Sequence, residues 1–325
     1  MAKVTFEQKT LDINDGASVL ETLLDAGFDI PNACRAGACH SCLMQAVDGQ
    51  PPEDAQQGLK DSQQAQKFFL ACCCHPETDL VVALPHDEDV RITCKVTHKA
   101  QIAGDILEVR LAPQSNFSYQ GGQYITLWKD HHDGRSYSLA SVPGLDDELI
   151  LHIREIPGGA LSQWLQDKVN PNDMVDIQGP SGDCFYSPGE EDKPLLLVGT
   201  STGLAPLYGI LRDALKQGHS GPIYLFHGAL DASGLYLVET LQHIAATNEQ
   251  VHYYPSVVKG EAAEGIQVGL VDELVMQTVP DLKDFRVYLC GAPELVEQLK
   301  KQVFLKGASM SRIYADPFLP PSNAK

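Results

Sequence analysis

The sequence of 325 residues lacks any apolar run near the roughly 18 residues that a membrane-spanning helix needs. Its first residues, Met1 to Glu7, read as the start of a strand and contain no apolar signal-peptide core. Basic residues are also scarce, with 24 Lys and Arg against 43 Asp and Glu, which gives a net charge of −19. These absences argue against a membrane helix and against a nucleic acid partner, and we expect a cytoplasmic protein.

The acidic residues gather in the first part of the chain. Residues 1–90 contain 15 acidic and 5 basic side chains, a net charge of −10. Two interpretations are open for this excess of negative charge. It either serves solubility alone or forms an acidic face that steers a basic redox partner. The same segment holds most of the nine cysteines, and in a reducing compartment cysteines indicate metal binding more than disulfides.

Four of these cysteines have the spacing C-x4-C-x2-C followed by a gap of 29 residues. This is a [2Fe–2S] spacing, in which four thiolates hold two irons. Structural zinc usually pairs two short knuckles, and only one C-x2-C is present. A Rieske site also needs a C-x-H pair, which is missing, although Cys72 and His75 supply a C-x-x-H. The predicted ligands are Cys34, Cys39, Cys42 and Cys72.

Hydrophobic periodicity divides the chain into three parts. Two short strands, a helix and a cysteine loop indicate a small α+β domain, which a strand at 80–84 closes. Six short β segments between 91 and 177, one of them at 137–140, are punctuated by Gly and Pro and predict an antiparallel barrel. From 195 onward strands alternate with helices, beginning with a strand at 195–198, a helix at 206–217 and a strand at 223–227. This alternation predicts a parallel sheet with a nucleotide site at the carboxyl ends of its strands. We therefore expect domains at 1–87, 88–188 and 189–325.

The barrel segment contains the string Arg135-Ser-Tyr137-Ser138. A flavin dinucleotide needs a cation for its pyrophosphate, a flat surface against its rings and a hydrogen bond near N5, which these three side chains can supply. An ordinary surface β-ribbon also accommodates the string. The flavin interpretation gains weight from Gly158-Gly159, which lead into a helix and offer free N–H groups to an anion.

The third part contains a glycine-rich turn, Gly199 to Pro206, between an apolar strand and a helix. Backbone N–H groups in such a turn face a diphosphate, although the turn is not a G-x-G-x-x-G fingerprint. Cys290-Gly291 follow a later strand, where a thiol is either a buried strand end or part of a site. Asp231 can accept a hydrogen bond from a ribose 2′-hydroxyl and repel a 2′-phosphate, which favours NADH.

Together these motifs resemble known families over nearly the whole chain. Residues 1–85 resemble plant-type ferredoxin domains, with the four cysteines in the ligand positions, and the rest resembles the FAD and NAD domains of the ferredoxin–NADP reductase superfamily. Cys72 is chosen from three adjacent thiols because the family's fourth ligand follows Leu-Ala. Two departures are His40 and Ser201, which stand where the families usually have Gly.

The resemblance implies a β-grasp ferredoxin domain (α+β), a six-stranded antiparallel β-barrel that binds FAD, and an α/β parallel-sheet domain that binds NADH. It implies direct roles in hydride transfer for Ser138, Cys290 and Phe318, although Phe318 either covers the flavin or docks on the core. The implied FAD contacts are Arg135, Tyr137, Ser138, His152, Ile153, Arg154, Gly159, Leu161 and Ser162. The implied NADH contacts are Gly199, Thr202, Gly203, Asp231, Cys290 and Gly291.

The three modules in this order resemble the reductase components of bacterial multicomponent oxygenases. This implies a monomeric enzyme that passes electrons from NADH through FAD and the [2Fe–2S] cluster to an oxygenase docked near the acidic ferredoxin domain. A reductase for a deoxysugar-biosynthesis dehydrase has the same module order, and the ending that starts at Asp316 resembles that group as well. A passive electron carrier or redox sensor is the alternative of a different class.

Overall fold

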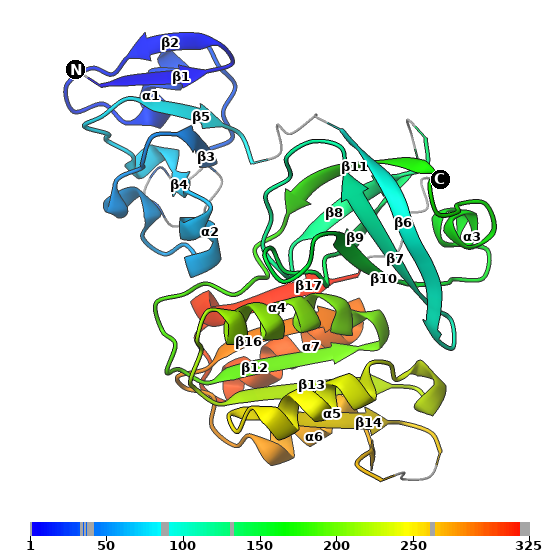
Figure 1. Cartoon of the computed structure of the whole chain (residues 1–325). Coiled ribbons are helices and arrows are strands. Elements are labelled where there is room, and N and C mark those ends of the chain that lie inside the picture. Colours follow the sequence, from blue (N-terminus) through cyan, green and yellow to red (C-terminus); the bar gives the residue numbers. More distant parts are fainter. Residues whose placement is uncertain are drawn as a thin grey trace. The chain divides into compact units, whose positions relative to one another are not determined.

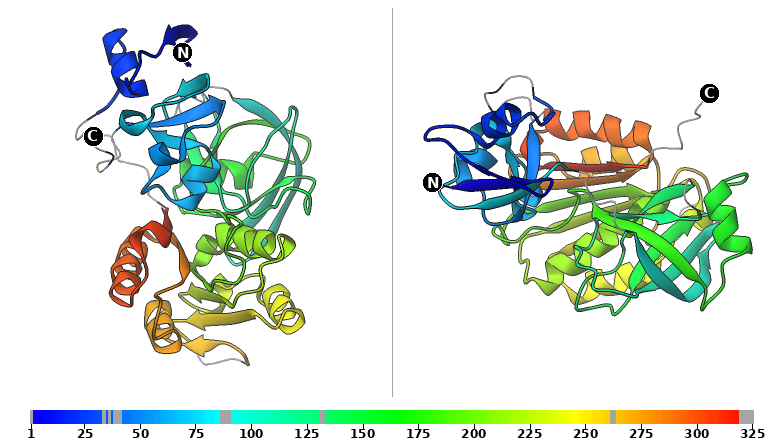
Figure 2. Two further views of the ribbon diagram at one scale, coloured as in Figure 1. Left: turned by 90° about the vertical axis from the view of Figure 1, so that its left-hand side faces the viewer. Right: turned by 90° about the horizontal axis from the view of Figure 1, so that it is seen from above.

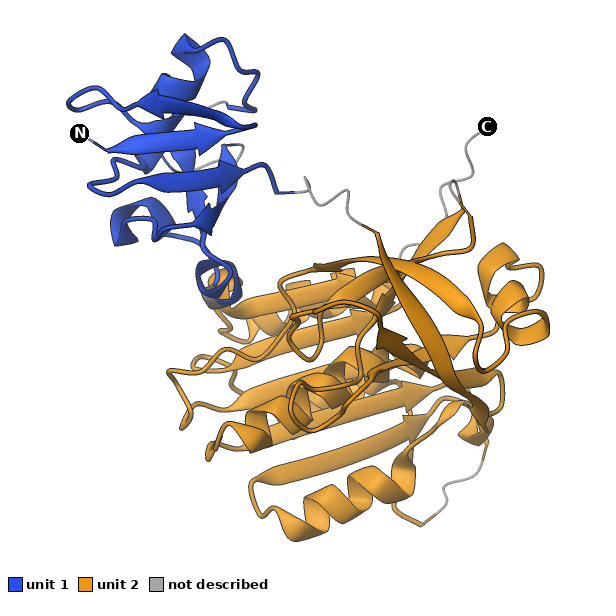
Figure 3. Ribbon diagram, turned by 45° about the horizontal axis from the view of Figure 1, so that its top comes forward, with its two compact units in different colours: residues 1–89 blue, residues 90–325 orange. Residues whose placement is uncertain are grey.

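The structure is a computed structural model that describes residues 2–32, 35, 37, 42–85, 91–130, 133–260 and 264–318. The predicted ligands Cys34 and Cys39, together with His40, lie outside these residues. The chain divides into two compact units, residues 1–89 and residues 90–325 (Figure 3). Within the described residues, no helix is long and apolar enough to cross a membrane.

The first unit is a small mixed sheet with a helix on it. Its elements are β1 (Lys3–Phe6), β2 (Lys9–Asp12), α1 (Val19–Asp25), β3 (Leu43–Asp48), α2 (Asp61–Ala65), β4 (Phe68–Leu70) and β5 (Leu80–Ala83). The sheet order is β2-β1-β5-β3-β4, with β1 antiparallel to β2 and parallel to β5. The helix α1 begins at a capping box, because Ser18 Oγ accepts from Glu21 N at 3.2 Å and the Glu21 carboxylate accepts from Ser18 N at 2.9 Å.

The second unit begins with six antiparallel strands. They and one helix are β6 (Ile92–Ala103), β7 (Ile106–Pro113), β8 (Tyr124–Trp128), β9 (Gly134–Ser138), β10 (Leu149–Arg154), α3 (Ala160–Asp167) and β11 (Met174–Ser181). The sheet order is β10-β7-β6-β11-β8-β9, and a bridge from Leu139 to Leu151 joins the two outer strands. The predicted antiparallel barrel is therefore confirmed.

The strand of the flavin motif begins earlier than predicted. The sequence suggested a strand at 137–140, whereas β9 pairs with β8 from Gly134 to Ser138. Gly134 makes this start possible, because a Cβ there would lie 2.6 Å from the Trp128 ring. All three side chains of the motif therefore project from one regular strand.

A parallel sheet forms the rest of the second unit (Figure 1). Its elements are β12 (Leu195–Thr200), α4 (Leu204–Lys216), β13 (Ile223–Ala229), α5 (Val238–Thr247), β14 (Val251–Val257), β15 (Gln267–Val268), α6 (Val271–Thr278), β16 (Arg286–Gly291), α7 (Pro293–Leu305) and β17 (Ile313–Pro317). The strands are ordered β15-β14-β13-β12-β16-β17 in the sheet. The chain fills the sheet outward from β12 in one direction and then continues on its other side with β16, and ligands of open parallel sheets bind at such a switch point.

Helices cover both faces of this sheet, with α4 and α5 on one face and α6 and α7 on the other (Figures 1 and 2). Two separate apolar clusters fill the layers. Leu207 and Leu211 of α4 pack in one cluster, and Leu299 of α7 packs in the other. The predicted alternation of strands and helices is confirmed.

Candidate functional site

The described half of the predicted iron–sulfur site lies where β3 meets β4. Leu43 pairs with Leu70, and the Ala71 N–H donates to Cys42 O at 3.0 Å. This register places Cys42 beside Cys72, which lies in the short turn after β4, and the two thiols interact directly. Two of the four predicted ligands are thus brought together from distant parts of the sequence.

The three adjacent thiols have different surroundings. Cys74 is fully buried in the apolar core of the first unit. Cys72 and Cys73 are half-buried, with their Sγ atoms 3.7 Å apart. A Cβ on Gly37 would lie 3.0 Å from Cys73 Sγ, so the chain at Gly37 passes close to Cys73. The contact with Cys42 supports Cys72 as the fourth ligand, whereas Cys74 belongs to the core.

The flavin motif presents a cation and a phenol on β9. The Arg135 side chain is 38% exposed, so an anion can reach it, and its guanidinium lies 3.3 Å from the Asp133 carboxylate. Tyr137 is half-buried against the barrel core, and burial raises the pKa of its hydroxyl. A neutral phenol with one accessible side suits contact with a flat, uncharged ring system.

The turn before α3 fits the phosphate part of a dinucleotide. Gly159 is the N-cap residue, and no side chain of the described residues caps the helix. A Cβ on Gly159 would lie 2.7 Å from Ser162 Oγ and 2.9 Å from Ile156 O, so the turn requires glycine there. Ser162 Oγ accepts from Ile156 N at 3.1 Å, and the Leu161 side chain packs in the barrel core. Leu161 can therefore contribute only its backbone to a ligand.

Two of the three predicted contacts on β10, His152 and Ile153, are also limited to the backbone. The side chains of His152 and Ile153 are buried, and Arg154 pairs with Asp105 at 2.8 Å. Burial lowers the pKa of His152 to about 3, so its ring is neutral and cannot act as a cation for a phosphate. One edge of β10 pairs with β7, and on the other edge Ile150 is engaged, because its C=O accepts from Ala140 N at 2.9 Å and its N–H donates to Ser141 Oγ at 3.1 Å. A ligand on that edge would therefore meet the backbone at 152–154.

The two predicted nicotinamide turns lie side by side. Gly199 at the end of β12 is paired with Cys290 at the end of β16. A Cβ on Gly203 would lie 2.4 Å from Cys290 O, and one on Gly291 would lie 2.9 Å from Thr200 Oγ1. Both glycines are thus required for close approach of the turns, and the backbone N–H groups of 199–203 gather at the carboxyl end of the sheet.

One contact joins the flavin motif to the nicotinamide turns. Ser138 Oγ donates to Asp316 Oδ2 at 2.9 Å, and Asp316 on β17 is the pairing partner of Cys290 on β16. Phe318 N donates to Gly291 O at 2.8 Å, so the chain passes along the same turn. The three residues predicted to act in hydride transfer are therefore gathered around Asp316.

Asp316 was not among the predicted site residues. The one signal in the sequence is that Asp316 is the single acidic residue of the segment Tyr314 to Phe318. Burial raises the pKa of Asp316 to about 6, against the opposing effect of the Ser138 hydrogen bond. Burial also raises the pKa of the Cys290 thiol, whose Sγ lies 3.7 Å from that of Cys184. The site thus combines neutral donors with one carboxyl group that titrates near neutrality.

Asp231 follows β13 as predicted, and its carboxylate is already engaged. It accepts from the backbone N–H of Ser233 at 3.0 Å and from Ser233 Oγ at 2.5 Å, and these bonds lower its pKa. The charge of Lys259 acts on the same carboxylate. Sequence reasoning missed this lysine, because it reaches Asp231 from just beyond β14, the strand that pairs with β13.

Three family models match consecutive parts of the chain. The 2Fe-2S iron-sulfur cluster binding domain matches residues 4–77, the oxidoreductase FAD-binding domain matches residues 93–186, and the oxidoreductase NAD-binding domain matches residues 197–301. The predicted fold of each part and the predicted set of cofactors are confirmed.

Relatives of known activity span almost the full chain. It is 32% identical over 327 residues to the ferredoxin–NAD(P)+ reductase component of the naphthalene 1,2-dioxygenase system of Pseudomonas putida, with 96% of each protein covered. It is 26% identical over 316 residues to a CDP-6-deoxy-L-threo-D-glycero-4-hexulose-3-dehydrase reductase of Yersinia pestis, with 94% of this chain and 95% of that protein covered.

Among solved structures, a cytochrome P450 reductase of Amycolatopsis is 31% identical and superposes with a TM-score of 0.69 over 99% of this chain and 100% of that one. The chain therefore belongs to the family of iron–sulfur flavoprotein reductases that combine a ferredoxin-type domain with FAD-binding and NAD-binding domains.

Proposed function

We propose that the chain is an NADH-dependent reductase that passes electrons through FAD and a [2Fe–2S] cluster to an external metalloenzyme. The hydrogen bond between Ser138 and Asp316 supports this most directly, because it joins the flavin strand to the nicotinamide turns within one site. When bound, the flavin accepts a hydride and gives up its electrons one at a time, chemistry that a protein side chain cannot supply.

In this proposal, the residues around Asp316 act on the reacting atoms. Ser138 offers its Oγ to the flavin while its proton is held by Asp316. Cys290 presents a neutral thiol at the nicotinamide, because burial raises the pKa of its sulfur. Phe318, fixed through its backbone to Gly291, stands at the turn where the nicotinamide enters. The protein supplies position and electrostatics, and the cofactors supply the chemistry.

The other predicted contacts hold the cofactors in place. For FAD, Arg135 would bind the pyrophosphate together with the N–H groups of Gly159, Leu161 and Ser162, Tyr137 would lie against the rings, and the backbone of 152–154 would contact the ribityl chain. For NADH, the backbone at Gly199, Thr202, Gly203 and Gly291 would bind the diphosphate, and Asp231 the ribose. Cys34, Cys39, Cys42 and Cys72 would hold the cluster.

We propose an oxygenase component as the acceptor, because the reductases of dioxygenase and O-demethylase systems are among the relatives. A deoxysugar dehydrase is the second candidate, because reductases for such an enzyme align over most of the chain. The acidic first unit would meet the partner. We further propose that the protein is a cytoplasmic monomer with domains at 1–87, 88–188 and 189–325.

Anaerobic mixing of the purified, FAD-loaded protein with NADH tests this proposal. We expect the flavin absorbance to bleach first and the cluster absorbance second, and cytochrome c to be reduced in steady turnover. We expect kcat/KM to be higher for NADH than for NADPH. Asp231→Ala should narrow this difference, because it removes the carboxylate that repels a 2′-phosphate and leaves the positive charge of Lys259 near the proposed ribose position. Absence of NADH oxidation would refute the proposal, and a preference for NADPH would refute the role of Asp231.

A further inference from the structure

The helix α4 connects the nicotinamide turn to the flavin strand. It begins at Leu204, directly after Gly203 of the glycine-rich turn, and its Gly209 lies against the segment that follows Ser138. A Cβ on Gly209 would lie 2.8 Å from Leu139 O and 2.9 Å from Gly122 N. These two atoms are hydrogen-bonded to each other at 3.0 Å, so the helix backbone rests on a fixed part of the barrel.

The close approach is reciprocal. A Cβ on Gly121 would lie 3.0 Å from Gly209 O, so glycine is required on both sides of the contact. One methyl group at either position would push α4 away from the barrel by several tenths of an ångström, because both opposing surfaces are backbone. The distance between α4 and the barrel, and hence between the nicotinamide turn and the flavin strand, therefore depends on glycine at both positions.

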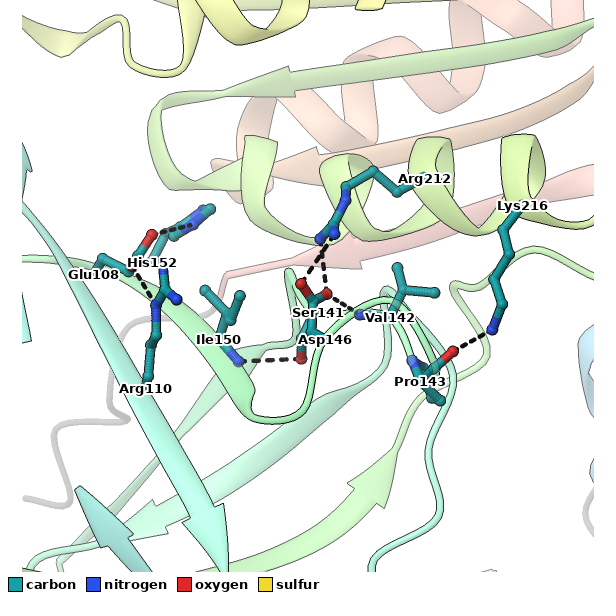
Figure 4. A network of polar contacts seen from close by, with 10 residues as sticks. All are labelled: Glu108, Arg110, Ser141, Val142, Pro143, Asp146, Ile150, His152, Arg212 and Lys216. Carbon is teal, nitrogen blue, oxygen red and sulfur yellow. Dashed lines mark hydrogen bonds and ion pairs between the residues drawn. The ribbon is translucent and has the colours of Figure 1, made fainter. Parts of the chain in front are cut away.

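An ion pair fixes the same helix one turn further on (Figure 4). Arg212 donates two hydrogen bonds to Asp146, at 2.8 and 2.9 Å, and Asp146 Oδ2 also accepts from Val142 N at 2.7 Å. The two side chains are only 18% and 14% exposed. A bidentate pair of this kind fixes orientation as well as distance, and when partly buried it adds more to geometry than to stability.

A third contact extends the attachment to the end of the helix. Lys216 donates to Pro143 O, which directly follows the Val142 N–H that Asp146 holds (Figure 4). Successive turns of α4 thus meet the barrel at Gly209, Arg212 and Lys216. None of these residues belongs to the flavin or nicotinamide motifs, yet they determine where the helix, and hence the turn at its start, lies.

We propose that Gly209 and the Arg212–Asp146 ion pair are positioning residues for hydride transfer, because they hold the nicotinamide turn at a fixed distance from Ser138. This inference rests on the proposed reductase activity. Hydride transfer requires the reacting atoms to approach to about 3–3.5 Å, and a misplacement of about 1 Å can cost roughly a hundredfold in rate. A rigid helix contact limits such displacement without touching either cofactor.

Gly209→Ala tests the contact directly. We expect the rate constant for flavin reduction at saturating NADH to fall by about tenfold or more, because α4 moves off Leu139. The NADH dissociation constant should change by less than about threefold, since the turn itself is intact. The kinetic isotope effect with C4-deuterated NADH should increase, which a loss of stability alone would not produce.

Arg212→Lys and Asp146→Asn test the ion pair with milder changes. Lysine keeps the charge and loses the second hydrogen bond, while asparagine removes the charge and can still accept from Val142. We expect each to slow flavin reduction by about threefold, and the double variant to be no slower than the worse single one, because the two changes remove the same interaction. Lys301→Ala, at an exposed position of α7, is the matched control and should have no effect.

A wild-type reduction rate in Gly209→Ala with full FAD content would overturn the proposal, as would a loss confined to NADH affinity. If Gly209→Ala fails to fold, Arg212→Lys decides on the same criteria. Absence of NADH oxidation by the wild-type protein would overturn the proposed function as well, whereas unchanged variants of an active enzyme would overturn only the positioning role.

Discussion

Ser201 is the residue under the most evident backbone strain in the dinucleotide turn. Its φ is +51°, a left-handed value that side chains with a Cβ adopt at a cost of about 1–2 kcal/mol. Glycine adopts it freely but loses more entropy on folding, by about 0.5–1 kcal/mol.

We therefore expect Ser201→Gly to stabilise the second unit by about 0.5–1 kcal/mol, the difference between these two costs. Urea unfolding of the FAD-loaded protein, followed by flavin fluorescence, measures it. Ser309→Gly is the matched control, because Ser309 has a φ of −71° and gains nothing from glycine. Equal destabilisation in both variants would show that Ser201 is unstrained.

Asp316 gives the site a predictable dependence on pH. Its folded-state pKa is raised to about 6 from 3.8, mainly because burial disfavours the carboxylate. The folded state therefore binds the proton more tightly than the unfolded state. The sign follows from linkage, since the contribution of Asp316 to stability is fully present below about pH 4 and is lost as the pH rises through about 6.

Asp316→Asn removes this titration while keeping an acceptor for Ser138. We expect the thermal midpoint of the variant, relative to the wild type, to rise between about pH 4 and pH 6 and to stay nearly constant above that. Calorimetry of the two FAD-loaded proteins across this range provides the comparison. Parallel curves would mean that the Asp316 carboxyl titrates at its ordinary pKa in the folded protein.

For single residues, the sequence identified Ser138 and Cys290 as candidates but did not identify Asp316, the residue that lies beside both. Ser138 and Cys290 were found from local motifs, because a flavin strand and a nicotinamide turn have recognisable residue patterns. Asp316 was missed because its importance depends on strand pairing that puts it beside Cys290 and within 2.9 Å of Ser138. Such proximity comes from tertiary structure and leaves no periodic signal.

Strands with continuous apolar runs were predictable at the level of the element. β12 and β13 lie within two residues of their expected bounds, because buried parallel strands are apolar on both faces. β4 was missed because it has only three residues, too few to show alternation. β17 was missed because it forms an edge, pairs only with β16 among the described strands, and contains Asp316 and Pro317.

The start of α4 shows a further limit of sequence patterns. The helix was expected from Pro206, whereas it begins at Leu204, with Pro206 in its first turn. Proline fits there because first-turn N–H groups need no helical partner. The two additional residues bring the helix directly onto the glycine-rich turn, and this continuity is what lets contacts along α4 control the position of the turn.

For the whole molecule, the division into two units assigns the two proposed steps to different units. The residues proposed for hydride transfer lie in the second unit, and the cysteines proposed to hold the cluster lie in the first. The apolar core of the first unit, from Val4 to Val82, draws on no described residue of the second, and the Ser138–Asp316 contact lies wholly within the second. A change at the cluster ligands should therefore leave flavin reduction intact. The acidic excess belongs to the unit that would hold the cluster, which is where we propose that the electron acceptor approaches.

Cys72→Ser tests this separation. We expect the visible absorbance of the cluster to disappear while the flavin spectrum stays, because Cys72 lies beside Cys42 and far in sequence from any flavin residue. NADH-driven ferricyanide reduction should stay within about twofold of the wild type, because this small acceptor can take electrons from the flavin. Cytochrome c reduction should fall by about tenfold or more, since in the proposed route the cluster passes the electrons to a protein acceptor. Cys74→Ser is the control, because that thiol is buried in the core and should retain the cluster. Loss of the cluster in Cys74→Ser and its retention in Cys72→Ser would reverse the ligand assignment.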